Sequence, residues 1–371
     1  MSKHNADNER VKHQYLMYLK EAKRLSESSI DTAMAAIGRF EAYSGHREFK
    51  KFHIHQAVAF KRKLSEEVSP RTGERLSSAT ILATLNALRA FFQWLAMQPG
   101  YRSRITHPDA DYFALSERET RIARTTLERP VPTIEQILHV LRLMPIETEI
   151  ELRNRGIIAF TLLTGARDGA VASLKLKHID IEQRKIVQDA REVRTKFAKS
   201  FETWFFPVGD EVYSIVAGWV RLLRKEKLFG SDDPLFPATR VGLNRDHHYQ
   251  ADGLSREHWS NATPIRQIFK QAFVAAGLPY ANPHTFRKTL AQLGERLCHT
   301  PEEFKAWSQN LGHEQVLTTF SSYGHVRSDR QAELIRSLGR PRPAASSDGE
   351  FFQRVIQVVA EYQTSQPERP S

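Results

Sequence analysis

Cysteine is nearly absent from this sequence: its 371 residues include one, Cys298. A single cysteine excludes an intrachain disulfide framework and a zinc site built from several thiolates. We expect Cys298 to be buried in a helix, because free cysteines behave as small apolar residues. No apolar run approaches the ~20 residues that span a bilayer, and the first residues, MSKHNADNERVKHQ, lack the apolar stretch of a secretory signal. The sequence therefore predicts a soluble, cytoplasmic protein with no membrane partner.

Two features of metal- and nucleotide-dependent enzymes are missing as well. The sequence has no glycine-rich phosphate-binding loop. It also has no cluster of acidic residues of the kind that holds metal ions in nucleases. We therefore predict no cofactor and no metal site, so that any phosphate chemistry would rely on side chains alone.

Positive charge, in contrast, is abundant. Lysine and arginine number 54 against 43 acidic residues, which gives a formal net charge of +11 and a pI of about 9.7. A chain of this charge favours a polyanionic partner such as nucleic acid, with an anionic membrane surface as the alternative. Its length predicts two domains, each large enough for its own core.

The first part of the chain, residues 1–110, predicts a helical bundle. Apolar residues recur at helical spacing from a cap at Ser28 or Ser29 to Phe40, and again after a cap at Ser77 or Ser78. Shorter helical stretches lie near residues 15–22 and 55–64. The basic residues on the outside of this unit, which include Lys61, Arg62 and Lys63, could by themselves be an ordinary solvated surface.

A linker is predicted over residues 111–132, within a stretch that lacks a sustained apolar pattern from about Arg102 onward. It ends in the sequence RPVP, which disfavours a helix. Thr133 and Gln136 then have the spacing of a capping box, so a second domain is expected to begin at residue 133 and to extend to residue 340.

The second domain predicts helices together with a small antiparallel sheet. One helix ends near Leu163, a short turn TGAR follows, and residues 185–208 alternate as strands do. Residues 230–263 have no clear periodicity, which predicts a long loop or an insertion. The tail, residues 341–371, contains a short amphipathic helix that could dock on its own domain or on a neighbouring subunit.

Several polar residues stand at helix ends and turns, where core packing does not require them. Arg167 follows Gly165 between two helices, and His284 and Arg287 lie one helical turn apart on a side that the apolar stripe leaves free. His313 follows the helix end at Gly312, where the carbonyl dipoles favour its protonated form. The remaining candidates are Lys196, in the predicted strand hairpin, and Tyr323.

These residue types suit attack on a phosphodiester without a metal. Cationic side chains can neutralise the charge that builds up on phosphorus, a histidine can accept the tyrosine proton, and a lysine can protonate the departing 5′ oxygen. Each residue alone has a simpler explanation: Tyr323 could be a buried ring, and His313 a plain helix cap. The argument therefore depends on the whole set.

The ordered motifs TGAR, TK, HTFR, LGH and TTFSSYGH closely resemble the catalytic domain of the tyrosine recombinase (phage integrase) family. The helical N-terminal unit with its linker resembles that family's core-binding domain, so that the resemblance covers about residues 10–340 of this chain. The resemblance implies a mainly α fold: a helical N-terminal core-binding (SAM-like) bundle and an α+β catalytic domain with a small antiparallel sheet. It also implies a catalytic set of Arg167, Lys196, His284, Arg287, His313 and the nucleophile Tyr323. Residues expected to contact DNA are Lys61, Arg62, Lys63, Lys199 and Lys288.

This chain departs from the family pattern in two places. Ala170 stands where many members have an acidic residue, although Asp168 is close by in the sequence. The interval from His313 to Tyr323 is one residue longer than usual. Lys199 is also kept as an alternative to Lys196, because the register of a hairpin is easily misjudged.

The resemblance implies a site-specific recombinase or integrase that cuts and rejoins duplex DNA through a 3′-phosphotyrosine intermediate. It further implies a C-shaped clamp on double-stranded DNA, a homotetramer in the synapse, accessory DNA-bending proteins as candidate partners, and a nucleoid-associated location. A relaxation enzyme like the type IB topoisomerases and a DNA-binding regulator that no longer cuts are the alternatives. The sequence leaves open whether the role is integration, transposition or chromosome resolution.

Overall fold

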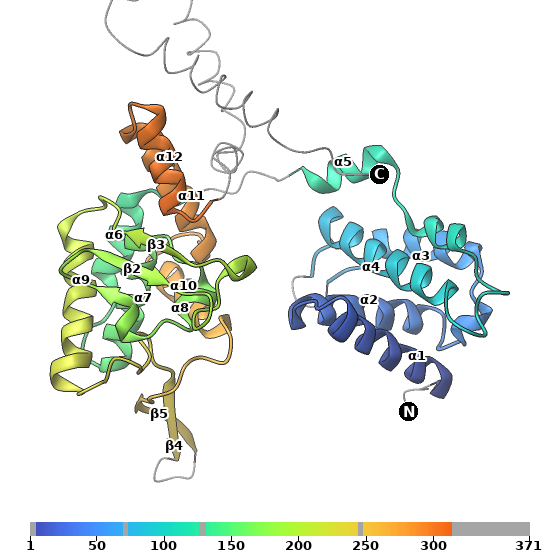
Figure 1. Cartoon of the computed structure of the whole chain (residues 1–371), viewed down its shortest axis with the longest axis horizontal. Coiled ribbons are helices and arrows are strands. Elements are labelled where there is room, and N and C mark those ends of the chain that lie inside the picture. The colour runs from blue at the N-terminus through green and yellow to red at the C-terminus, as the bar shows by residue number, and fades with distance from the viewer. Residues whose placement is uncertain (1–4, 70–72, 126–130, 244–247, 314–371) are drawn as a thin grey trace, which may run out of the picture. The chain divides into compact units, whose positions relative to one another are not determined.

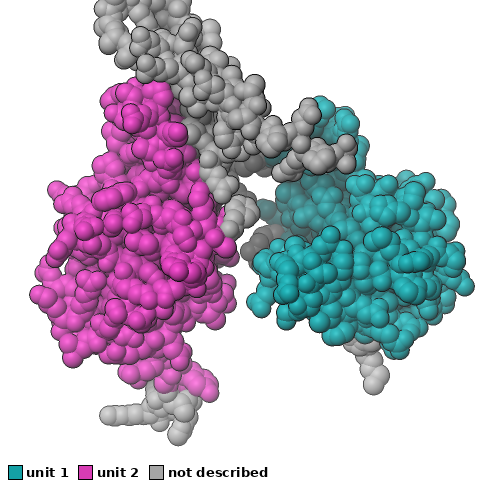
Figure 2. All heavy atoms as spheres, in the orientation of Figure 1, with its two compact units in different colours: residues 1–127 teal, residues 128–371 magenta. Residues whose placement is uncertain are grey.

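The computed structural model describes residues 5–69, 73–125, 131–243 and 248–313. The chain divides into two compact units, residues 1–127 and 128–371, which Figure 2 colours separately. The division falls within the segment predicted as a linker, whose linking role stays a prediction. Tyr323 and the predicted tail helix lie outside the described residues. None of the described helices is long and apolar enough to cross a membrane.

The first unit is a helical bundle around an aromatic core. Phe40 meets Phe60, Phe92 and Phe113 edge to face, with ring centroids 5.3 to 5.4 Å apart. Rings in this arrangement attract one another in addition to burying apolar area. The helical periodicity therefore predicted the bundle correctly. Its α-helices (Figure 1) are α1 (Ala6–Met17), α2 (Glu27–Tyr43), α3 (Ile54–Glu66), α4 (Ser78–Ala96) and α5 (Glu117–Arg124).

Two boundaries in this unit differ from the prediction. The cap of α2 is Ser26, whose hydroxyl accepts from the Ser29 amide at 3.3 Å, so the helix begins earlier than a cap at Ser28 or Ser29 would place it. The predicted connector also contains a 3-10 helix, His107–Phe113, and α5. A capping box of Ser116 and Glu119 starts α5, but Ala123 is its one buried residue, and the rest of its surface is polar apart from the exposed Ile122. A helix of this kind leaves no apolar stripe in the sequence.

The second unit is built on α7, whose residues from Gly156 to Thr164 are all buried. α7 packs against α9 and α11. The predicted capping box of Thr133 and Gln136 is confirmed at the start of α6. The α-helices of the unit are α6 (Ile134–Leu143), α7 (Glu149–Thr164), α8 (Asp168–Val171), α9 (Asp210–Arg221), α10 (Thr263–Ala275), α11 (Pro283–Leu297) and α12 (Pro301–Asn310).

The predicted antiparallel sheet is present, with the strand order β1-β2-β3. The strands are β1 (Ile179–Asp180), β2 (Lys185–Gln188) and β3 (Phe201–Trp204). In the central strand, Ile186 pairs with Ile179 on one side and with Thr203 on the other. All three side chains are buried, so one face of the sheet contributes to the core.

Two predictions for the second unit need correction. Of the two alternatives for residues 230–263, a long loop or an insertion, the loop is wrong, because β4 (Thr239–Leu243) and β5 (Tyr249–Leu254) form an antiparallel hairpin there that extends away from the unit in Figure 1. The strands have exposed side chains and therefore show no apolar alternation. Cys298 is only partly buried, because α11 ends at Leu297, itself 45% exposed, and residue 298 caps it.

Candidate active site

Arg167 lies at the junction predicted from the TGAR motif. α7 ends at Gly165, which has a left-handed φ of 62° that glycine adopts without strain, and Arg167 is the N-cap residue of α8. Burial lowers the pKa of its guanidinium below the ordinary value. Among the residues that the structure describes, Arg167 makes no hydrogen bond or ion pair. Within the described part of the chain it is thus a partly desolvated cation without an anionic partner.

Arg287 holds the two neighbouring helix ends together. Its Nη1 donates to the Gly165 carbonyl and its Nη2 to the Leu311 carbonyl, both at 2.5 Å. Only 5% of the residue is exposed, and burial together with the Arg167 charge lowers its pKa to about 9. It therefore remains charged at neutral pH. The sequence placed His284 and Arg287 together on a side of the helix that the apolar stripe leaves free; in the structure His284 is exposed and Arg287 is buried, and their common role at a ligand stays a prediction.

His313 is positioned by the docking of α12 on the sheet. The Asn310 side chain accepts from the Trp204 amide at 2.7 Å and donates to the Trp204 carbonyl at 2.9 Å. The Thr203 hydroxyl also donates to the Asn310 carbonyl at 3.1 Å. These bonds occupy the edge of β3. They place the left-handed Gly312, whose φ is 70°, and His313 directly after a fixed helix end.

The protonation state of His313 differs from the prediction. Its Nε2 lies 3.0 Å from Arg287 Nη2, and a guanidinium has only donors, so Nε2 must accept. The imidazole is then neutral, with its proton on Nδ1. Burial, followed by the charges of Arg287 and Arg167, lowers the pKa of His313 to about 4. These effects outweigh the helix dipole on which the prediction of a protonated ring rested.

His284 is also surrounded by positive charge. Partial burial of its ring lowers its pKa, and the nearby charges of Arg287, Lys288, Arg167 and Lys196 lower it further. The imidazole is therefore favoured in its neutral form at physiological pH, in which one ring nitrogen can accept a proton.

Lys196 and Lys199 lie at the two ends of a short 3-10 segment between β2 and β3. The charge of Lys196 contributes to the lowered pKa of His284, and that of Lys199 to the lowered pKa of His313. Both lysines thus lie within electrostatic range of a site histidine. The choice between Lys196 and Lys199 stays open on this geometry.

The structure brings five predicted residues into one cationic site: Arg167, Lys196, His284, Arg287 and His313. They come from the start of α8, the β2–β3 segment, α11 and the end of α12. Tyr323 lies outside the described residues. Two neutral imidazoles beside two guanidiniums can bind a phosphate diester anion and can still accept or donate a proton.

The residues flanking Arg167 do not supply the acidic group that many family members have. Ala170 is buried. The Asp168 carboxylate accepts from Arg266 Nε at 2.6 Å, so its charge is paired with α10.

The predicted DNA-contacting residues have different surroundings. Lys61 donates to the Ala114 carbonyl at 2.9 Å, and the Lys63 ammonium lies 5.2 Å from the centre of the Tyr43 ring. Arg62 is exposed. Lys288 lies next to the site, where its charge contributes to the lowered pKa of His284. Their contacts with DNA stay predictions.

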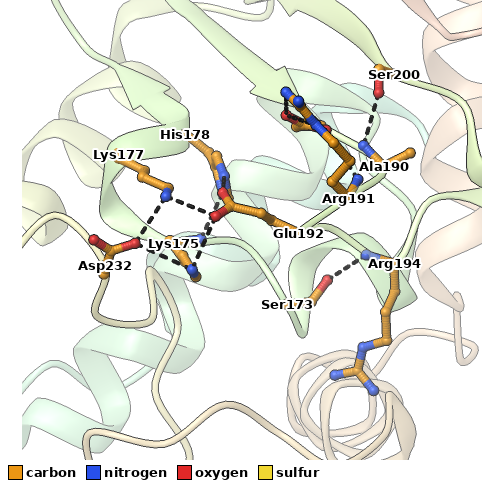
Figure 3. A network of polar contacts seen from close by, with 11 residues as sticks. Ser173, Lys175, Lys177, His178, Ala190, Arg191, Glu192, Arg194, Ser200 and Asp232 are labelled. Atoms are coloured by element: carbon orange, nitrogen blue, oxygen red, sulfur yellow. Dashed lines mark hydrogen bonds and ion pairs between the residues drawn. The ribbon is translucent and has the colours of Figure 1, made fainter.

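Sequence reasoning missed the residues that hold these groups in place. Asn310 directly precedes the LGH motif, and Arg194 lies two residues before Lys196 in a segment held by the polar network of Figure 3. Their positions next to motif residues are the only signal in the sequence. Their partners lie far away along the chain: Asn310 bonds residues more than 100 positions away.

Comparison with known proteins gives two family matches. Residues 132–330 match the model of the phage integrase family, and residues 13–98 match the model of the phage integrase N-terminal SAM-like domain. The first model alone covers more than half of the chain.

The chain is also similar to curated and solved relatives. It is 24% identical to tyrosine recombinase XerC of Lactobacillus delbrueckii subsp. bulgaricus, over 69% of this chain and 75% of that protein. It is 22% identical to XerC of Halalkalibacterium halodurans, over 87% and 95%.

Two solved structures share its fold. A lambda integrase dimer bound to a COC′ core site has a TM-score of 0.57 and 15% identity, over 91% of this chain and 98% of that one. The Tn1549 transposon integrase in complex with transposon right end DNA has a TM-score of 0.55 and 15% identity, over 89% and 99%.

Proposed function

The chain belongs to the phage integrase family of tyrosine recombinases, and on that premise we propose that it cuts and rejoins duplex DNA at specific sites through a 3′-phosphotyrosine intermediate. The proposed reaction needs neither ATP nor a metal ion. The proposed catalytic residues are Tyr323, Arg167, Lys196, His284, Arg287 and His313.

The observation that carries this proposal is the state of Arg167. A desolvated guanidinium without an anion is unfavourable, and a bound phosphodiester would supply the missing partner. Arg287 lies close enough for the Arg167 charge to lower its pKa, so two fixed cations would face the same phosphate. Such a pair stabilises charge that develops on the phosphoryl oxygens during attack.

The neutral histidines suggest separate roles. His313 accepts from Arg287 at Nε2, so the ring proton is on Nδ1, and we assign Nδ1–H as a donor to a phosphoryl oxygen of the bound DNA. His284, with its lowered pKa, can accept the phenolic proton of Tyr323 as the tyrosine oxygen attacks phosphorus. The bond between phosphorus and the 5′ oxygen then breaks, and that oxygen takes a proton from the Lys196 ammonium.

The second half of the reaction reverses the first. A 5′ hydroxyl from a partner duplex gives its proton to the neutral Lys196 amine and attacks the phosphotyrosine. The bond between phosphorus and the Tyr323 oxygen breaks, and that oxygen takes the proton that His284 held. The number of phosphodiester bonds is conserved, so no external energy source is needed. Without a partner duplex the same steps would relax supercoiled DNA, which is the alternative of a topoisomerase-like enzyme.

The proposed substrate is duplex DNA, and the net charge of +11 supports it. The lambda and Tn1549 integrases of similar fold are described as bound to DNA, the former as a dimer. For this chain we propose that the two units bind opposite sides of the duplex and that four protomers form the synapse. A cytoplasmic, nucleoid-associated location follows from that role.

A covalent trapping experiment tests the function. A duplex that contains the cognate site, with a nick placed so that the fragment carrying the 5′ hydroxyl is lost after cutting, should accumulate a denaturation-resistant protein–DNA adduct. The Tyr323→Phe variant should form none. Tyr249→Phe is the matched control, because Tyr249 is 83% exposed on the β4–β5 hairpin, and it should form as much adduct as the wild type.

Three results would count against the proposal. Absence of an adduct with the wild type would favour a DNA-binding regulator. An equal adduct with Tyr323→Phe would assign the nucleophile to another residue. Relaxation of plasmids that lack the site, without exchange between duplexes that carry it, would favour the topoisomerase-like alternative.

A further inference from the structure

The segment that carries Lys196 is held from both sides. It runs from Asp189 to Ser200, between β2 and β3. Its two ends are joined where the Ala190 amide donates to the Ser200 hydroxyl at 2.9 Å. Figure 3 shows the segment between two sets of polar contacts, one around Glu192 and one at Arg194.

Glu192 makes the first attachment. Its Oε1 accepts from Lys177 at 2.8 Å and its Oε2 lies 2.9 Å from His178 Nε2. Because His178 Nδ1 accepts from the Lys175 amide at 3.0 Å, Nε2 carries the proton and donates to Glu192. These contacts lower the pKa of the Glu192 carboxyl to about 2, chiefly through Lys177 and then His178. The carboxylate stays ionised and bonded to the chain that follows α8.

Arg194 makes the second attachment and bonds two separate segments, residues 172–173 and residues 259–260. Its amide donates to Ser173 Oγ at 2.8 Å. Its Nη2 donates to the Ala172 carbonyl at 3.2 Å and to the Trp259 carbonyl at 2.5 Å, and its Nη1 donates to the Ser260 carbonyl at 2.6 Å. The guanidinium therefore ties the Lys196 segment both to the chain that follows α8, the helix that Arg167 caps, and to the chain that leads into α10.

All three side-chain acceptors of Arg194 are uncharged carbonyls. An ion pair would tolerate variation in geometry, whereas a planar guanidinium that serves three carbonyls in different directions fixes its own orientation. Lysine, with a single nitrogen on a flexible stem, cannot reproduce this arrangement. Val193, directly before Arg194, is buried in the core, so the backbone leading to Lys196 is fixed at two consecutive residues.

We propose that Arg194 is a positioning residue, which holds Lys196 where its ammonium can protonate the departing 5′ oxygen. This inference rests on the proposed function and adds a specific role to it. Arg194 itself touches neither the phosphate nor the tyrosine. Without its side chain, the segment would remain attached through Glu192 and the Arg194 amide, but it would lose the three bonds to the carbonyls of Ala172, Trp259 and Ser260.

The test uses a leaving group that needs no proton. When phosphorus is attacked in normal DNA, the electron pair of the breaking bond goes to the 5′ oxygen, which must be protonated. If sulfur replaces that bridging oxygen, a thiolate leaves; thiols have pKa values of about 8.5, so the thiolate is stable without a donor. A variant that has lost the proton donor, or has it misplaced, should therefore cleave the sulfur substrate at nearly the wild-type rate. A variant that has lost a group stabilising the phosphate should still cleave it slowly.

Full-length variants are compared in single-turnover cleavage of the nicked duplex, with 5′-oxygen and with 5′-sulfur substrate. Arg194→Ala should cleave the oxygen substrate about 10²-fold more slowly, the loss expected when a reacting group is displaced by about 1 Å. It should cleave the sulfur substrate within a few-fold of the wild type. Arg194→Lys should behave similarly, although its charge is kept.

Three further variants calibrate the comparison. Lys196→Ala should show the same rescue after a larger loss on oxygen, of about 10²- to 10⁴-fold. Arg167→Ala should be slow on both substrates, because it would no longer bind the phosphate itself. Arg191→Ala is the matched control: this arginine lies in the same segment, its side chain bonds Asp189, two positions earlier, as its one hydrogen-bond partner among the described residues, and its removal should leave both rates unchanged.

Ser173→Ala tests the same attachment if Arg194→Ala does not fold. It removes the acceptor of the Arg194 amide and should give a smaller loss on oxygen, again rescued by sulfur. Wild-type rates for the Arg194 and Ser173 variants, or equal losses on both substrates, would overturn the inference while the proposed function stands. If the wild type forms no adduct on either substrate, the proposed function itself fails.

Discussion

At the scale of single residues, the chemistry of the site depends on histidines that stay neutral among positively charged neighbours. His313 stands at a helix C-terminus, a position that favours an imidazolium. However, it lies within hydrogen-bonding distance of one guanidinium and in the field of a second. The sequence shows the helix end, but it does not show that Arg287, 26 residues earlier in the chain, contacts His313. A charge state that depends on a tertiary contact could therefore not be predicted from the local motif.

The lowered pKa of His313 predicts how stability depends on pH. Its pKa is about 4 in the folded protein and about 6.5 in an unfolded chain. Between these values the unfolded state binds a proton that the folded state refuses, so the free energy of unfolding should fall as the pH is lowered from 6.5 towards 4. His284, whose pKa is also lowered, should contribute in the same direction.

Urea unfolding at several pH values between about 7 and 4.5 measures this dependence. His313→Asn should lose less stability on acidification than the wild type. The control is His139→Asn, which changes an exposed histidine on α6 and should keep the wild-type slope. A His313→Asn protein with an unchanged slope would show that the ring is not held neutral.

At the scale of elements, the docking of α12 on β3 decides where His313 lies. Asn310 uses both the oxygen and the nitrogen of its amide on the backbone of Trp204, as a neighbouring strand would. Asn310→Ala should therefore lower the free energy of unfolding by about 1–3 kcal/mol, since two backbone groups lose their partners. It should also slow formation of the covalent adduct. Thermal unfolding and adduct formation measure the two effects.

Gln309→Ala is the control for this prediction. Gln309 is exposed on the same helix, and its replacement should change neither stability nor adduct formation. If Asn310→Ala were as stable and as active as the wild type, the position of His313 would depend on other contacts.

The elements that the sequence predicted are those with local signals. The Thr133–Gln136 capping box and the TGAR turn each depend on residues within one turn of the chain, and the structure has both. The sheet followed from the alternation in residues 185–208. α5 and the β4–β5 hairpin were missed because neither buries a regular apolar face. Arg194 was visible in the sequence, but its carbonyl partners at residues 259 and 260 could be found only in three dimensions.

At the scale of the whole molecule, the excess of positive charge predicts a salt-dependent affinity for DNA. The logarithm of the DNA-binding constant decreases linearly with the logarithm of the salt concentration. The magnitude of this slope should decrease by about one for every phosphate that a variant no longer binds. Arg62→Ala should have this effect if exposed Arg62 binds a phosphate. Lys61→Ala should instead lower stability by about 1 kcal/mol, because Lys61 bonds the Ala114 carbonyl. Titrations of DNA at several salt concentrations, together with thermal unfolding, separate the two.

If the slope for Arg62→Ala equals that of the wild type, Arg62 does not bind a DNA phosphate. A reduced slope for Lys61→Ala at full stability would mean that its bond to Ala114 gives way to a phosphate in the complex.

The exposed ring of Trp204 gives the molecule a built-in optical reporter. The chain has five tryptophans. Trp204 is 52% exposed, whereas Trp94, Trp219 and Trp259 are at most 8% exposed and Trp307 is partly buried. The backbone of Trp204 is the part that Asn310 bonds. A dissolved quencher should therefore reach the Trp204 emission first, and a change in that quenching would report the undocking of α12 in solution without any attached label.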